Sequence, residues 1–281
     1  AAHRQYVVGD DLRHIDWNIY GRLDRLFLKL FLEEEDLSLH IVLDASASSD
    51  AGSPSKYVFM QQLALALAYV GLVNLHRVTI SVIAGAQVST SPDPDDAHAS
   101  TPSAPGAAPN SPAAVQHLRD LRGRRRLHDL ARFLLGIVPA GGGVASGSSF
   151  TDAATRIALT RRGKGVMLVL SDFFIKEGYD TGLRLLLGRG YDVYAVQVLS
   201  PQEIEPDLGG DLRLRDAEDG DVAEVTISAP LLKKYKQNLT AYVNRLRDFC
   251  ARRDIVHLML PSSTPVDTAV LDYLRRLGLV R

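Results

Sequence analysis

Cysteine is almost absent from this 281-residue chain, since Cys250 is the only one. A single cysteine excludes an internal disulfide and a cysteine-rich metal site. It is typical of a reducing compartment, so we expect a cytoplasmic protein. An excess of one charge is also lacking, because 32 basic and 33 acidic residues leave a formal net charge of -1. Nothing in that balance points to nucleic acid or to an anionic membrane as a partner.

Long apolar runs are missing as well. The most hydrophobic stretch, residues 57–73, is interrupted by Gln61 and Gln62 and falls short of the roughly 20 residues that cross a bilayer. We interpret it as a buried helix and expect no membrane span in this chain. Residues 1–20 are polar and charged, so no signal peptide is visible. The chain begins without Met, as a fragment of a longer protein would.

What the sequence does contain is a regular alternation of strand-like and helix-like segments. The alternation predicts an α/β fold with a mostly parallel sheet flanked by helices on both faces. Two segments that flank Glu-Asp-Gly predict a hairpin, 211–217 and 221–228. Strands are expected at 39–44, 78–88, 165–171, 191–199 and 254–260, and helices at about 55–73, 124–137, 151 onward, 180–188, 231–249 and 266–277.

The chain is expected to form one main domain, residues 37–281, after an N-terminal arm, residues 1–36. Residues 26–32 are too densely apolar for a free linker. We therefore expect the arm to pack on the main domain, with Trp17 buried and the charged turn up to Asp16 outside. Inside the main domain, Ser, Pro, Ala, Asp and Gly dominate residues 89–113 without periodicity, which predicts a flexible insertion.

Oxygen-bearing side chains follow two of the expected strands. Asp44, Ser46 and Ser48 form an Asp-x-Ser-x-Ser cluster after one strand, and Asp172 follows the strand at 165–171. In a parallel sheet ligands bind outside the carboxyl ends of the strands, so the two groups are expected at one edge. Carboxylate and hydroxyl oxygens suit Mg²⁺, Mn²⁺ or Ca²⁺ rather than Zn²⁺. The alternative is a set of helix N-caps, which explains one serine but not two converging loops.

This arrangement resembles the metal-ion-dependent adhesion site of von Willebrand factor A domains. The resemblance adds Thr151, in Phe150-Thr151-Asp152, as a ligand that acts directly or through water. It implies that the ion is usually Mg²⁺ and that an acidic group from a protein partner completes its coordination. Phe150 departs from the Gly that usually precedes the Thr, which leaves Ser148 or Ser149 as competitors of Thr151.

The N-terminal segment resembles a second signature. Residues 4–17 and the acidic stretch at 33–36 are similar to the bacterial "domain of unknown function 58" family, whose members carry a von Willebrand factor A-like domain after such a segment. Members are often linked with MoxR-type AAA+ ATPases, so the resemblance implies such an ATPase as the partner. It is close over residues 4–48, moderate over 150–172, and limited to the order of elements beyond that.

Enzyme chemistry is not predicted from the motifs. The glycine loop at 141–147 lacks the Gly-Lys-Ser/Thr of a nucleotide-binding loop. An aspartyl phosphatase would use Asp44 as nucleophile, but Ser46 stands where its general acid is needed. We therefore expect a non-enzymatic, metal-dependent protein-protein interaction module, with a Mg²⁺-dependent phosphatase-like enzyme or a metal-free interaction domain as alternatives. Four charged signature residues are expected to form salt bridges and turns that hold the arm against the main domain, with cation binding by the three carboxylates as the alternative: Asp10, Asp11, Arg13 and Asp16.

Overall fold

The chain divides into two compact units, residues 1–36 and 37–281. The prediction that the first unit packs on the second stays a prediction. The expected insertion at 89–113, the glycine loop at 141–147, Ser148 and Ser149 all lie outside the residues that the structure describes. This computed structural model describes residues 2–30, 38–83, 87–88, 115–139, 150–160, 164–188, 190–217 and 221–275.

A six-stranded sheet forms the centre of the second unit, in the order β12-β9-β8-β3-β4-β6. Neighbouring strands are parallel except at the edge, where β6 runs antiparallel to β4. Strands that are covered on both faces need nearly continuous apolar sequences, and β8 reads Gly-Val-Met-Leu-Val-Leu-Ser. The strands are β3 (Ser38–Asp44), β4 (Arg77–Ile83), β6 (Val115–Leu121), β8 (Gly165–Ser171), β9 (Tyr191–Leu199) and β12 (Val256–Pro261).

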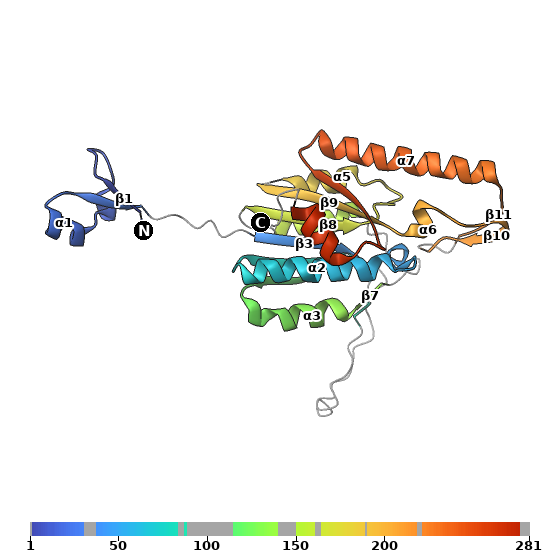
Figure 1. The fold of residues 1–281 in the computed structure, drawn as a ribbon, viewed down its shortest axis with the longest axis horizontal. Helices are drawn as coiled ribbons and strands as arrows, with labels where there is room; N and C mark the ends of the chain where they lie inside the picture. The colour runs from blue at the N-terminus through green and yellow to red at the C-terminus, as the bar shows by residue number, and fades with distance from the viewer. Residues whose placement is uncertain are drawn as a thin grey trace, which may run out of the picture. The chain divides into compact units, whose positions relative to one another are not determined.

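Helices cover both faces of this sheet, as Figure 1 shows. Each face has its own cluster of buried apolar side chains. The predicted α/β fold, a mostly parallel sheet flanked by helices, is therefore confirmed. One face carries α2 (Lys56–Val73), α3 (Leu127–Leu135), α8 (Val266–Thr268) and the last helical turns, η4 (Ala269–Leu274); the other carries α4 (Phe150–Thr160), α5 (Asp180–Leu187) and α7 (Ala229–Ala251).

Helix α2 begins where Ser55 accepts a hydrogen bond from the backbone N–H of Val58. Such an N-cap satisfies a backbone donor that the helix itself leaves unpaired. Within the described ranges, α2 is the one helix with the length and apolar character of a membrane span, but 56% of that stretch is buried in the domain. A core helix passes the same test, and the apolar cluster around α2 agrees with the predicted buried helix.

Short elements complete the second unit. The predicted hairpin is confirmed, because β10 pairs with β11 in antiparallel register. The turn α6 follows β9 directly, and β5 pairs with β7. Their bounds are β10 (Gly210–Arg215), β11 (Val222–Ile227), α6 (Pro201–Ile204), β5 (Gln87–Val88), β7 (Ile137–Val138) and the turns η2 (Ala47–Asp50) and η3 (Arg124–Arg126).

The first unit is a small hairpin with one helix. Its strands pair antiparallel, and residues 27–30 of the apolar run form the second strand. Trp17 is 65% exposed within this unit, and its expected burial by the second unit stays a prediction. One expectation is wrong: Asp16, expected outside, is buried. Asp16 is buried because its carboxylate caps the helix by accepting from two backbone N–H groups. The elements are β1 (Ala2–Gln5), η1 (Leu12–His14), α1 (Trp17–Leu23) and β2 (Phe27–Leu30).

Other charged signature residues build turns inside the same unit. Asp10 accepts from the Arg4 guanidinium at 2.6 Å and from the backbone N–H of Val7 at 2.9 Å. Asp11 accepts from the backbone N–H of Arg13 at 3.0 Å. These contacts lower the pKa values of both carboxyl groups, and the hydrogen bonds are the main cause. The signature therefore has a local structural basis in this part of the chain.

Candidate functional site

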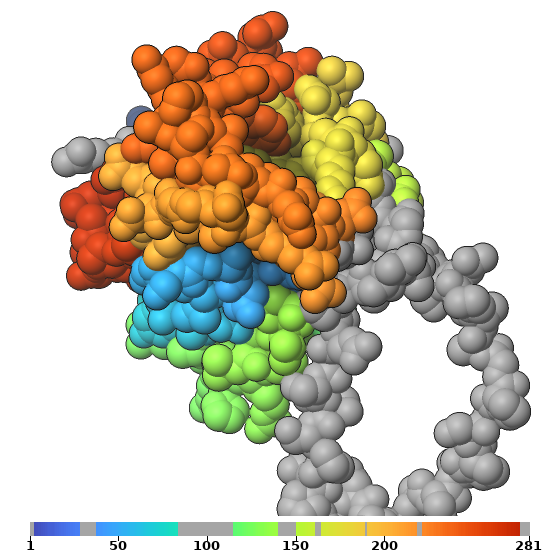
Figure 2. All heavy atoms as spheres, turned by 90° about the vertical axis from the view of Figure 1, so that its right-hand side faces the viewer, coloured from blue at the N-terminus to red at the C-terminus, as the bar shows by residue number. Residues whose placement is uncertain are grey.

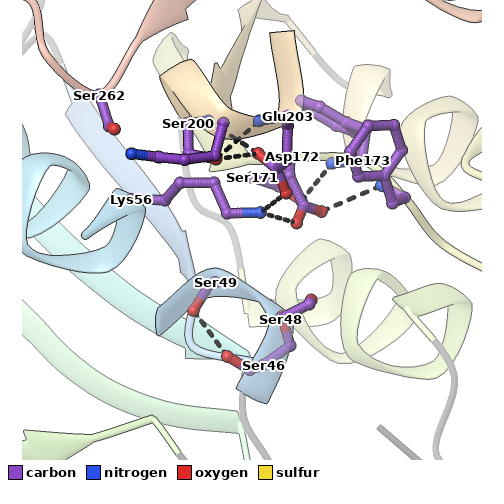
Figure 3. A network of polar contacts seen from close by, with 12 residues as sticks. Ser46, Ser48, Ser49, Lys56, Ser171, Asp172, Phe173, Ser200, Glu203 and Ser262 are labelled. Carbon is purple, nitrogen blue, oxygen red and sulfur yellow. Dashed lines mark hydrogen bonds and ion pairs between the residues drawn. The ribbon is translucent and has the colours of Figure 1, made fainter. Parts of the chain in front are cut away.

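The carboxyl edge of the central sheet brings together four of the five predicted ligands. β3 ends at Asp44, Ser46 is the N-cap of η2, and Ser48 lies inside that turn. β8 lies beside β3 in parallel register, so Asp172 follows at the same edge. Figure 3 shows Ser46 and Ser48 on the loop that faces the cluster around Asp172.

Asp44 is fixed by hydrogen bonds to both carboxylate oxygens. The backbone N–H of Ser46 donates to Oδ1 at 3.0 Å, and the Ser171 hydroxyl donates to Oδ2 at 2.6 Å. The hydroxyl oxygens of Ser46 and Ser48 lie 3.2 Å apart. The turn after β3 thus presents one carboxylate and two hydroxyls side by side, which are hard oxygen ligands.

The negative charge of Asp44 is poorly compensated. Withdrawal from solvent and the nearby charge of Asp172 raise the pKa of Asp44 to about 6. Hydrogen bonds from Ser171 and Ser46 act in the opposite direction and offset this only in part. A raised carboxyl pKa means that the ionised form is disfavoured, which is the condition that a bound cation would relieve.

Asp172 has a partner that sequence reasoning missed. Lys56, the first residue of α2, donates from Nζ to Asp172 Oδ2 at 2.7 Å and to Glu203 Oε1 at 2.6 Å. The Lys56 side chain is 0% exposed, and that of Asp172 is 3% exposed. Burial acts to lower the pKa of Lys56, but the two carboxylates outweigh it, and the pKa is raised. Figure 3 shows the Lys56 side chain pointing toward Asp172 and Glu203, with dashed lines from its ammonium group.

The sequence contains weak signals for this pair. Lysine in the first turn of a helix opposes the helix dipole, so Lys56 is an unusual choice at that position. Ser200 and Glu203 have the spacing of a capping box, which the structure confirms. The backbone N–H of Ser200 donates to Glu203 Oε2 at 2.7 Å, so one carboxylate both caps α6 and binds Lys56.

The backbone around Asp172 is also held in place. The backbone N–H of Phe174 donates to Asp172 Oδ1 at 3.0 Å, and the Gln197 amide donates to the Asp172 carbonyl at 3.0 Å. Phe173 adopts a left-handed conformation, with φ 59, and its carbonyl accepts a hydrogen bond from the Tyr242 hydroxyl. The Asp172 carboxylate is therefore a fixed group rather than a mobile one.

Thr151, the fifth predicted ligand, is the second residue of α4 and is half-buried. The start of α4 is anchored because Phe150 packs against Gly182 of α5, where a Cβ atom would come within 2.4 Å of the Phe150 ring. Across the described ranges, no hydrogen bond joins the Thr151 side chain to the other predicted ligands. Its role as a ligand stays a prediction.

The residues present fit part of a divalent-ion site. Asp44, Ser46 and Ser48 supply hard oxygens, and hydrogen bonds compensate the negative charge of Asp44 only in part. Asp172 is less available as a metal ligand, because Lys56 already donates a hydrogen bond to one of its carboxylate oxygens. In the part of the chain that the structure describes, no three His, Cys, Asp or Glu side chains are grouped to hold a metal. Such an ion would therefore need hydroxyls, water and an outside ligand.

An apolar pocket of about 670 Å³ lies beside the site. Glu203 lines it and binds Lys56 as well, so the pocket and the ion pair share a residue. Figure 2 shows this end of the domain, with the hairpin and α7 in orange above α2 in blue. The apolar lining comes mainly from the hairpin and from α7: Leu208, Leu214, Val225, Ile227, Leu231, Leu232 and Tyr235.

A protein-family model matches this chain over residues 2–116 and 105–245, which is most of its length. The family is described as "Protein of unknown function DUF58". The chain belongs to the DUF58 family. The resemblance inferred from the N-terminal signature is thereby confirmed. This match does not extend to the adhesion-site geometry of von Willebrand factor A domains.

Relatives of this DUF58 chain are found in mycobacteria. Uncharacterized protein Rv1480 of Mycobacterium tuberculosis (strain H37Rv) is 26% identical over 242 residues, which are 85% of this chain and 67% of that protein. Uncharacterized protein MAV169 of Mycobacterium avium is 30% identical over 125 residues, which are 43% of this chain and 68% of that protein.

Two solved structures show a distant likeness. BatB from Bacteroides thetaiotaomicron has a TM-score of 0.48 and 13% identity, over 86% of this chain and 98% of that one. An aerotolerance-related membrane protein from Bacteroides fragilis has a TM-score of 0.49 and 15% identity, with the same coverage of 86% and 98%. Likeness at this level transfers no function.

Proposed function

We propose that this DUF58 chain is a non-enzymatic protein-binding module that works with a divalent ion, Mg²⁺ or another hard cation such as Mn²⁺ or Ca²⁺. The observation that supports it is the convergence of Asp44, Ser46 and Ser48 beside Asp172. The raised pKa of Asp44 reflects negative charge that a cation would compensate.

In this proposal Asp44, Ser46 and Ser48 contribute one oxygen each, while Thr151 and Asp172 act directly or through water. This is the set of the metal-ion-dependent adhesion site of von Willebrand factor A domains, which the sequence resembles. Mg²⁺ prefers six oxygen ligands and keeps several waters, so a carboxylate of a partner can replace one water. Partner binding then depends on the ion.

The proposed partner is a protein that offers an acidic residue at this edge of the sheet. A MoxR-type AAA+ ATPase is the class that the family resemblance implies, and a cytoplasmic setting agrees with the single, buried Cys250. The balanced charge gives no reason to propose nucleic acid as a partner.

We propose no catalytic role, because Ser46 cannot transfer the proton that an aspartyl phosphatase takes from its second acid. Purified protein with Mg²⁺ should leave phosphate esters and nucleotides unchanged beyond background. Reproducible turnover that is lost in Asp44→Asn would favour the phosphatase alternative instead.

Affinity capture from the native host tests the binding module. Wild type with Mg²⁺ should retain a AAA+ ATPase, whereas wild type in EDTA and Asp44→Asn with Mg²⁺ should not. Asp192→Asn is the matched control. Asp192 is exposed near the start of β9, at the other end of the strand from the carboxyl edge of the sheet. Equal capture by all four samples would mean a metal-free interaction domain.

A further inference from the structure

The least expected feature of the site is a fully buried lysine. Lysine is almost never fully buried unless it is paired, because an ammonium group loses its hydration there. Lys56 is 0% exposed and touches two carboxylates, Asp172 and Glu203. Its ammonium group also lies 6.0 Å from the centre of the Phe174 ring. The fold therefore encloses a positive charge at the edge where the ion is proposed to bind.

The charges around this group do not balance. Three carboxylates meet one ammonium at this edge: Lys56 binds those of Asp172 and Glu203, and Asp44 is hydrogen-bonded to Ser171, the neighbour of Asp172. Lys56 contacts Asp172 and Glu203, while Asp44 takes its hydrogen bonds from Ser171 and from the backbone of Ser46. Two formal negative charges remain after Lys56 is counted, which matches the charge of one divalent cation.

We propose that Lys56 is a built-in counter-cation that shares Asp172 with the divalent ion and thereby sets the affinity of the site. The inference rests on the ion site of the proposed function and deepens it. Lys56 is a positioning residue, since it acts on the ion through Asp172 and through charge repulsion. Glu203 gives the ammonium a second partner, so Lys56 stays paired when Asp172 has another cation beside it.

The placement of Glu203 extends the argument to the neighbouring pocket. The same side chain lines the apolar pocket, caps α6 through Ser200 and binds Lys56. A change in how strongly Glu203 holds Lys56 therefore changes how strongly Lys56 holds Asp172. Loss of the Lys56 charge should therefore raise the affinity for the ion, and loss of the Glu203 charge should lower it.

The test is Mn²⁺ binding by the 281-residue chain, measured by calorimetry and by the shift in melting temperature. Lys56→Met removes the charge and keeps most of the side-chain volume, and it should bind Mn²⁺ at least about tenfold more tightly than wild type. Glu203→Gln leaves Lys56 paired with Asp172 alone and should bind Mn²⁺ more weakly. Lys234→Met, at an exposed position of α7, is the matched control and should bind as wild type does.

The outcomes separate this inference from the proposed function. Equal affinity of wild type, Lys56→Met and Glu203→Gln would overturn the role of Lys56 and leave the ion site standing. Binding by Lys56→Met alone would support the role of Lys56 and overturn ion dependence of the native protein. Absence of binding in every variant overturns both. If Lys56→Met does not fold, Glu203→Gln decides, because unchanged affinity there contradicts the inference.

Discussion

Asp44 experiences two opposing influences. Hydrogen bonds from Ser171 and Ser46 favour its ionised form, whereas burial and the charge of Asp172 disfavour it more strongly. Lys56, the buried cation nearby, contacts Asp172 and Glu203. The Asp44 carboxylate in this environment reduces the stability of the ion-free protein, and strongly shifted groups of this kind are typical of functional sites.

This imbalance predicts that Asp44→Asn stabilises the ion-free protein at neutral pH. The folded pKa of Asp44, about 6, lies above the unfolded value near 3.8. The associated stability is therefore complete below about pH 4 and is lost as the pH rises through 6. A neutral amide avoids that loss, so the variant should gain roughly 1–3 kcal/mol at pH 7.5 and less at pH 5.

Urea unfolding in EDTA at the two pH values measures this difference, with Asp192→Asn as the control for loss of one surface carboxylate. A variant that is less stable than wild type at both pH values would mean that the Asp44 charge is already compensated in the folded protein.

At the residue scale, the sequence predicted Asp44, Ser46, Ser48 and Asp172 as ligands because they stand at or just after the end of an apolar strand. It missed Lys56 and Glu203 because their contacts join residues 116 and 147 positions apart. The capping-box spacing of Ser200 and Glu203 and the place of Lys56 at a helix start mark these residues singly, but neither signal shows that Lys56 and Glu203 meet. The contact depends on the parallel order of β3, β8 and β9, which only the folded sheet establishes.

Among the elements, the start of α4 depends on a glycine in α5. Gly182→Ala would place a methyl group 2.4 Å from the Phe150 ring, closer than atoms can approach. Because overpacking of a core typically costs about 1–3 kcal/mol, we expect a loss of that size in thermal or urea unfolding. The double variant with Phe150→Leu should recover part of it.

Gly21→Ala is the matched control, because nothing lies within 4 Å of its Cβ position in α1. That change should be neutral or slightly stabilising, as alanine is the better helix former. If Gly182→Ala behaves in the same way, Phe150 does not anchor α4 as described.

The elements were predicted best where patterns are strong. The predicted strands at 165–171 and 191–199 coincide with β8 and β9. β6 was missed because Gln, His, Arg and Asp interrupt its apolar residues, as an antiparallel edge strand tolerates. The short helix α1 was missed because seven residues show too little periodicity to recognise.

For the molecule as a whole, the two units give the chain one convenient probe. Trp17 is the only tryptophan and lies 65% exposed in the first unit. Unless the second unit covers it, its fluorescence should resemble that of a solvated indole and be strongly quenched by acrylamide in the native protein. Blue-shifted emission that resists the quencher would show that Trp17 is covered, as the sequence had led us to expect.

The central claim is that the carboxyl edge of the sheet binds a divalent ion, and stabilisation by the ion tests it most directly. A ligand that binds only the folded state adds about 2.7 kcal/mol when present at roughly 100 times its Kd. The melting temperature in Mg²⁺, Mn²⁺ or Ca²⁺ should be higher than in EDTA for wild type and Asp192→Asn, but not for Asp44→Asn. No rise in wild type with any of the three ions, or an equal rise in Asp44→Asn, would contradict the account.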